Sequence, residues 1–62
     1  MTDLQILKQA LFEMNIGYEN ISDESIEITN ETEPRMEYNY GNTITFEFDK
    51  NGKLKSILAT GE

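Results

Sequence analysis

The four residues Asp-Lys-Asn-Gly that begin at Asp49 combine oxygen-bearing side chains with a glycine, as the start of a calcium-binding loop does. An EF-hand loop needs oxygen ligands at its first, third and fifth positions, glycine at its sixth and a bidentate glutamate at its twelfth. Counting from Asp49, Gly52 is fourth, Lys53 is fifth and Thr60 is twelfth, so the pattern fails at these positions. We therefore predict a tight turn here, with no metal ligand.

The chain lacks the side chains on which most catalytic sites depend. It has no histidine or cysteine, so the usual pairs of nucleophile and base are absent, and it has no glycine-rich phosphate loop. Two pairs of carboxylates close in sequence, Glu31 with Glu33 and Asp23 with Glu24, are of the type that does acid–base chemistry or holds a divalent cation. A chain of 62 residues has little room for a deep pocket. We predict a protein that is not an enzyme and has no cofactor.

Negative charge is concentrated in the middle of the chain. The net charge is −7, and residues 19–37 contribute −6 of it through seven acids and Arg35. Residues 38–62 are neutral, because three lysines balance three acids. Such a charge repels nucleic-acid phosphate and anionic lipid and attracts basic surfaces. We expect a protein partner with a basic surface, no direct contact with nucleic acid and no contact with a membrane.

Length and composition limit how the chain can be stabilised. Residues 1–62 make a single small domain, and a domain of this size buries only about 60% of the surface that its unfolded chain exposes. Without cysteine for disulfides or a Cys and His cluster for zinc, tight packing or self-association must compensate. No apolar run has the length of a membrane span, and Asp3 lies where a secretion signal is positive, so we expect a cytoplasmic protein.

The first part of the chain predicts a helix over about residues 2–15. Thr2 and Gln5 have the spacing of a capping box, which satisfies backbone N–H groups at a helix start. Apolar residues recur at steps of three and four and form one broad face: Leu4, Ile6, Leu7, Ala10, Leu11 and Met14. We expect Gly17 to end the helix in the left-handed conformation.

The rest of the chain predicts a sheet. Apolar and polar residues alternate over residues 25–29, 36–40 and 44–48, and residues 54–58 complete a fourth strand. The short connections are rich in turn residues, which favours an antiparallel meander. We predict an α+β fold in which the N-terminal helix packs on one face of three to four antiparallel strands.

The turn at residues 50–52 is expected to set the register of the last two strands. A three-residue loop with Gly52 left-handed gives apolar and oppositely charged cross-strand pairs, which a two-residue turn does not. The predicted pairs are Phe48 with Leu54, Ile44 with Leu58, and Glu47 with Lys55. One face then carries Ile44, Phe46, Phe48, Leu54 and Leu58, against which the helix packs.

The preceding hairpin leaves two arrangements open. A two-residue turn at Gly41-Asn42 pairs Tyr40 with Thr43 and Tyr38 with Thr45. It leaves an outer sheet face that carries Met36, Tyr38, Tyr40 and Ile57, a composition typical of interfaces. A three-residue loop instead turns the tyrosines into the core, but it needs a positive φ at Thr43, which a β-branched residue resists.

These observations favour a non-enzymatic interaction module that acts as a homodimer and binds a partner protein. The predicted partner-binding residues are Glu27, Glu31, Glu33, Glu37, Met36, Tyr38, Tyr40 and Ile57. Carboxylates along a strand resemble the charge of a phosphate backbone, so the partner class includes enzymes with a basic groove. The alternatives are a small divalent-metal-binding protein that uses the acidic turns, and an accessory protein with no small ligand.

The chain is short, acidic, free of cysteine, and rich in Ile, Asn and Glu. In this composition it resembles the small accessory proteins encoded by phages and mobile elements of AT-rich bacteria, some of which inhibit host enzymes. The resemblance extends over the whole chain and includes no motif. It implies an inhibitor of a host protein as one function and assigns no role to any residue.

Overall fold

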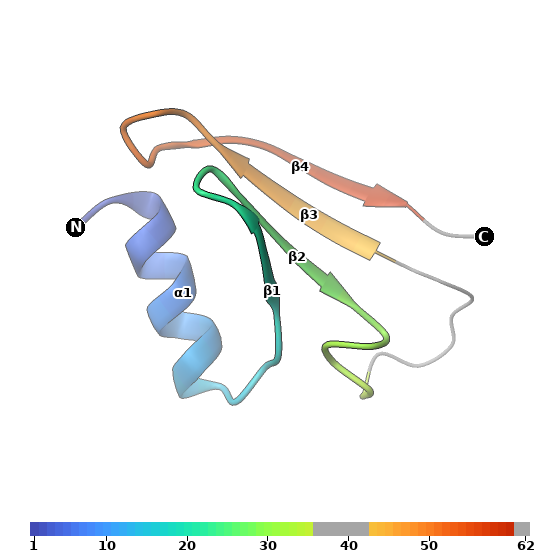
Figure 1. The fold of residues 1–62 in the computed structure, drawn as a ribbon. Helices are drawn as coiled ribbons and strands as arrows, with labels where there is room; N and C mark the ends of the chain where they lie inside the picture. Colours follow the sequence, from blue (N-terminus) through green and yellow to red (C-terminus); the bar gives the residue numbers. More distant parts are fainter. Residues whose placement is uncertain (36–42, 61–62) are drawn as a thin grey trace.

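The computed structural model describes residues 1–35 and 43–60, which form one helix and four strands. Their bounds are α1 Asp3–Glu13, β1 Glu19–Ser22, β2 Ser25–Thr29, β3 Thr43–Phe48 and β4 Leu54–Thr60. The strands form one antiparallel sheet in the order β1-β2-β3-β4, with α1 lying beside β1 and β4 forming the opposite edge of the sheet (Figure 1). The predicted α+β fold is confirmed.

The start of α1 is the predicted capping box. The Thr2 hydroxyl accepts the Gln5 N–H at 3.1 Å, and the Gln5 side chain accepts the Thr2 N–H at 2.9 Å. Asp3 in the first turn accepts the Leu54 N–H at 2.9 Å, and the Leu4 N–H donates to Gly52 O at 2.9 Å. These two bonds join the helix start to the β3–β4 loop, which lies beside it in Figure 1.

Asn15, and not Gly17, takes the left-handed conformation at the end of α1. Its φ is 60°, and the Ile16 N–H bonds to Leu11 O at 2.9 Å while the Asn15 N–H bonds to Phe12 O at 3.1 Å. This is a Schellman arrangement, and asparagine tolerates the left-handed region better than most residues. The prediction that Gly17 ends the helix in this way is wrong.

Gly17 is required for a different reason, a close approach of two backbone segments. A Cβ at Gly17 would lie 1.9 Å from the backbone oxygen of Thr32. Any side chain there would push the segment after β2 away from the segment that joins α1 to β1.

The core lies between α1 and the middle of the sheet. Leu11 from α1 is buried with Ile26, Ile28 and Phe48. Five partly buried apolar residues pack around them: Leu4, Leu7, Ile16, Tyr18 and Phe46. All seven residues of β4 are exposed, so α1 covers the β2 and β3 part of one face and leaves β4 uncovered.

The first strand, β1, was not predicted. Its four residues are polar except Ile21, show no alternation and are all exposed. It exists because it pairs with β2, where Asn20 lies opposite Ile26 and Ser22 opposite Ser25 across the turn. Pairing of backbone groups, which has no signature in these side chains, decides its conformation.

The β3–β4 loop has the predicted three residues. Gly52 is left-handed with φ 81°, its N–H donates to Asp49 O at 2.9 Å, and Phe48 lies opposite Leu54. The register then shifts by one residue, because Lys55 forms a bulge with no residue opposite it and Glu47 pairs with Ser56.

The predicted pairs beyond this bulge are therefore wrong. Ile44 lies opposite Ala59 and Leu58 opposite Thr45, so Leu58 is on the outer face and not beside the core. Ile57 lies opposite Phe46, which places it on the face that carries α1 and not on the outer face. One extra residue in a strand exchanges the two faces for every residue beyond it.

The pairs predicted for the 36–40 strand are also wrong. Thr43 lies between Thr29 and Thr60, and Thr45 lies between Glu27 and Leu58, so both edges of β3 are occupied. Residues 36–42, and with them the choice between outer face and core for the tyrosines, lie outside the described residues.

Candidate functional site

The strongest concentration of negative charge in the described structure is the β1–β2 hairpin, residues 19–27, which we call the acidic hairpin. It contains four acids and no lysine or arginine. Glu19 and Glu27 lie directly opposite each other on β1 and β2, and Asp23 and Glu24 form the turn that joins the strands. Glu27 is half-buried, and the other three side chains are exposed.

The charge of the acidic hairpin is not neutralised by the parts of the chain that the structure describes. The ion pair recorded there is Glu33 with Arg35, and it lies outside the hairpin. Like charges directly opposite on neighbouring strands destabilise a sheet. The Glu19 and Glu27 pair therefore lowers stability and leaves two carboxylates available to a cation or to a basic side chain of another molecule.

The outer face of the sheet continues this polar surface. Residues that share the face with Glu27 are Ser25, Thr29, Thr43, Thr45 and Glu47. The Ser56 hydroxyl donates to Glu47 Oε1 at 3.4 Å across β3 and β4. Leu58 is the apolar exception in β4, with 57% of its surface exposed. The described outer face thus offers carboxylates and hydroxyls for polar contacts.

Glu33 has a different role from the other acids. It is buried, and its two carboxylate oxygens accept four hydrogen bonds, from the Gly17 N–H at 3.1 Å, the Arg35 N–H at 3.2 Å, and the Arg35 Nε and Nη2 groups at 2.6 and 2.7 Å. Arg35 Nη2 also donates to Asn15 O at 2.6 Å. Glu33 and Arg35 thus tie the segment after β2 to the end of α1.

This bonding lowers the pKa of Glu33 from its ordinary value of 4.5 to about 2, chiefly because the Arg35 side chain bonds to the charged carboxylate.

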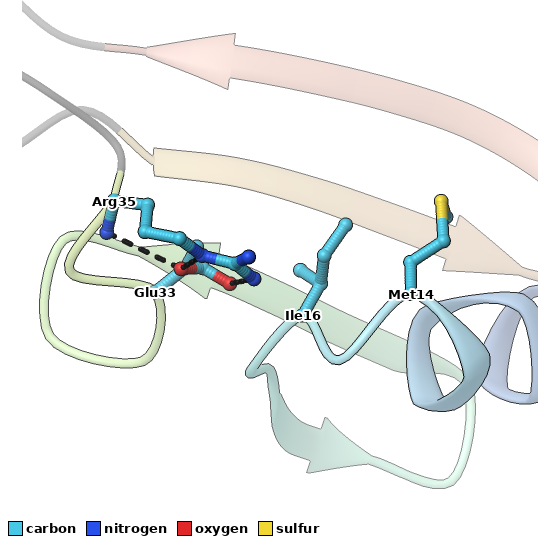
Figure 2. Close-up of a pocket in the computed structure, with 4 residues that line it drawn as sticks. All are labelled: Met14, Ile16, Glu33 and Arg35. Atoms are coloured by element: carbon cyan, nitrogen blue, oxygen red, sulfur yellow. Dashed lines mark hydrogen bonds and ion pairs between the residues drawn. The ribbon is translucent and has the colours of Figure 1, made fainter.

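The ion pair lines one end of a groove of about 450 Å³, with Ile16 and Met14 beyond it (Figure 2). A general acid needs a raised pKa, and a general base needs a free lone pair. Glu33 has neither property, so the groove has no acid–base group on its described lining.

Asp49 is also engaged within its own loop. Its Oδ1 accepts the Asn51 N–H at 2.8 Å and the Lys53 N–H at 3.0 Å, and these bonds to backbone groups lower the pKa of Asp49. The segment is the predicted tight turn. Within residues 1–35 and 43–60, no three acidic side chains are grouped closely enough to hold a metal ion.

Among the predicted partner-binding residues, the four that the structure describes do not form one surface. Glu27 is on the outer face, Glu31 is exposed in the turn after β2, and Glu33 is inside the chain. Ile57 is on the opposite face of the sheet, at its far edge. Met36, Glu37, Tyr38 and Tyr40 lie outside the described residues.

Sequence reasoning included Glu19 in the acidic region but did not single it out. Its importance depends on pairing with Glu27, and without the β1 strand that pairing is invisible. A hairpin signal was present in the two turn-forming residues, Asp23 and Glu24, between short segments.

No protein-family model, curated protein or solved structure matches this chain. None of the helices in the described part of the chain is long and apolar enough to cross a membrane.

Proposed function

We propose that this chain is a non-enzymatic interaction module that binds a protein with a basic surface through the acidic hairpin and the adjoining outer face. The observation that supports this most is the directly opposed pair of exposed Glu19 and half-buried Glu27, whose carboxylates have no cationic partner among the described residues. Such a pair lowers the stability of the free chain, and a basic partner removes that cost.

The geometry favours recognition by charge on an extended surface. Glu19 and Glu27 lie opposite each other on neighbouring strands, so the sheet fixes the spacing of their backbones before a partner binds. The field of the four acids accelerates encounter with a positive surface, and hydroxyls nearby supply hydrogen bonds. Fixed carboxylates of this kind compete for surfaces that otherwise bind phosphate.

A partner that itself binds nucleic acid fits this chemistry, with the chain acting as its inhibitor. The compositional resemblance to phage and mobile-element accessory proteins supports the same function. In that case, duplex DNA and this chain compete for one basic groove, and adding DNA releases the chain from its partner.

The test begins with capture of a binding protein from a lysate of the source cells and continues with its affinity for two double variants. Glu19→Gln with Glu27→Gln removes the opposed pair, and Glu13→Gln with Glu31→Gln removes two exposed acids elsewhere, so both variants change the net charge from −7 to −5. Calorimetric titration at salt concentrations from about 50 to about 300 mM measures both affinity and its salt dependence.

The hairpin variant is expected to bind roughly three- to tenfold more weakly, with a flatter salt dependence, and the control variant to bind nearly as the natural chain does. Equal losses in the two variants would show that only net charge matters. Unchanged binding by the hairpin variant would show that the partner uses another surface. Either result rejects the proposal.

A further inference from the structure

The two edges of the sheet differ in how well they are protected against pairing with another strand. The β1 edge is four residues long, carries Glu19 and is irregular between Asn20 and Ser22. The β4 edge is seven residues long, and from Ser56 to Thr60 it contains no charge and no proline. Short length, charge and bulges are the usual protections of an edge strand. From Ser56 onward, β4 has none of them.

Backbone groups of β4 are available along this edge. The Phe48 N–H donates to Glu24 O at 2.8 Å, so Phe48 directs its backbone groups away from β4. By alternation, Glu47 and Thr45 direct theirs toward β4, to Ser56 and Leu58. Ile57 and Ala59 alternate with Ser56 and Leu58 along β4. Their N–H and C=O groups therefore point to the free side, where the described sheet has no further strand.

Apolar side chains accompany these backbone groups. Ile57 is on the same face as the core but is 57% exposed, because α1 covers only the neighbouring strands. Leu58 on the outer face is also 57% exposed, and Leu54 is 40% exposed. A strand added beside β4 would cover Ile57 and Leu58 from the side as well as bond to the backbone.

We propose that the strand added at this edge is β4 of a second copy, antiparallel, with Ile57 opposite Ile57 of the other copy. A two-fold axis at Ile57 places the outward-directed backbone groups of Ile57 in the two copies opposite each other, so that the two sheets become one. Leu54 does not join this pairing, because its N–H already donates to Asp3 Oδ2 at 2.9 Å.

Charge favours a second copy at this edge in spite of the net −7 of each chain. Residues 54–60 contain Lys55 and no acid, whereas the acidic hairpin is at the other end of the sheet. Once the two sheets are joined, five strand spacings, roughly 24 Å, separate even the nearer acidic strands, the two copies of β2. That exceeds the Debye length of about 8 Å at physiological ionic strength, so repulsion between the acidic hairpins is largely screened.

The test uses Ile57→Lys and Ile57→Glu, which place like charges opposite each other only if Ile57 is on the two-fold axis. Sedimentation equilibrium from about 1 to about 500 μM is expected to give twice the mass of one chain for the natural protein and to give monomers for each variant. The dissociation constant should rise roughly tenfold or more in each variant. An equimolar mixture of the two should associate again, because Lys then faces Glu.

Two further variants separate pairing from folding. Ala59→Pro removes an N–H that points to the free edge and should abolish association while the circular dichroism spectrum is kept. Ile21→Lys on β1, an equally exposed position, should leave association unchanged. A natural protein that is monomeric at the highest concentration overturns the proposal. So does a dimer that persists in Ile57→Lys, or one that the Lys and Glu mixture does not restore.

Discussion

Glu33 and Arg35 show how much a single pair of side chains decides in a chain this small. They are two residues apart in sequence, in a turn-rich segment where an acid and a base are expected on the surface. In the structure, the Glu33 carboxylate is buried and links Arg35 to Gly17, and Arg35 continues to Asn15 O. The ion pair thus holds together two segments that are distant in sequence.

The first prediction concerns the pH dependence of this ion pair. The folded pKa of Glu33 is about 2, below its ordinary value of 4.5, so the stabilisation is present above about pH 5 and is lost as the pH falls toward about 2. Glu33→Gln is expected to lower the melting temperature at neutral pH and to make the loss of stability below about pH 5 less steep. Thermal unfolding followed by circular dichroism at several pH values measures both effects.

Glu31→Gln is the matched control, because Glu31 is exposed and its carboxylate accepts no hydrogen bond from the described residues. It should keep the acid sensitivity of the natural chain. The prediction fails if the two variants have the same melting temperature at neutral pH or the same response to acid.

At the scale of the elements, connections between segments matter more than their intrinsic propensities. α1 is tied at its start to the β3–β4 loop through Asp3 and Gly52, and at its end to the segment after β2 through Asn15. Gly17 allows that second connection, because only a residue without a Cβ fits against Thr32 O. The helix is positioned by these contacts as much as by its apolar face.

The second prediction tests this role of Gly17. Gly17→Ala is expected to lower the free energy of unfolding by about 1–3 kcal/mol, because the added Cβ displaces the backbone at Thr32. Asn15→Gly, two residues earlier, should be neutral or stabilising by up to about 1 kcal/mol, since glycine takes a left-handed conformation without penalty. Urea unfolding measures both. A harmless Gly17→Ala or a damaging Asn15→Gly would contradict this account.

For the molecule as a whole, one helix covers only part of one face of a four-stranded sheet. Four apolar residues of the described chain are fully inside, and Ile26 is the most enclosed, with 0% of its surface exposed. For 62 residues, a total stability of about 3–9 kcal/mol is the usual range. Each core residue therefore accounts for a large share of it.

The third prediction compares two isoleucines on neighbouring strands. Ile26→Ala is expected to cost about 2–5 kcal/mol and to leave much of the protein unfolded. Ile21→Ala on β1, where the side chain is 51% exposed, should change stability by less than about 0.5 kcal/mol. Urea unfolding at one protein concentration checks both values, and similar costs at the two positions would mean that the core is not where the structure places it.

Local patterns predicted the elements that have local signals. The capping box at Thr2, the alternation in β2 and β3, and the left-handed Gly52 were all found from the sequence because neighbouring residues determine them. The apolar face of α1 was predicted too wide, because Ile6 and Met14 are 51% and 56% exposed. β1 was missed because backbone pairing with β2 creates it. The acidic hairpin was recognised as a charged region but not as an opposed pair for the same reason.

The sequence by itself determined the α+β class, the uneven charge and the absence of cysteine and histidine chemistry, because these follow from composition and short-range periodicity. Only the tertiary structure decided which residues lie opposite one another. The bulge at Lys55 exchanged the faces of Ile57 and Leu58, and the fold buried Glu33 against Arg35 while it left Glu19 and Glu27 opposed. Register and contacts between distant segments depend on distances that exist only once the chain has folded.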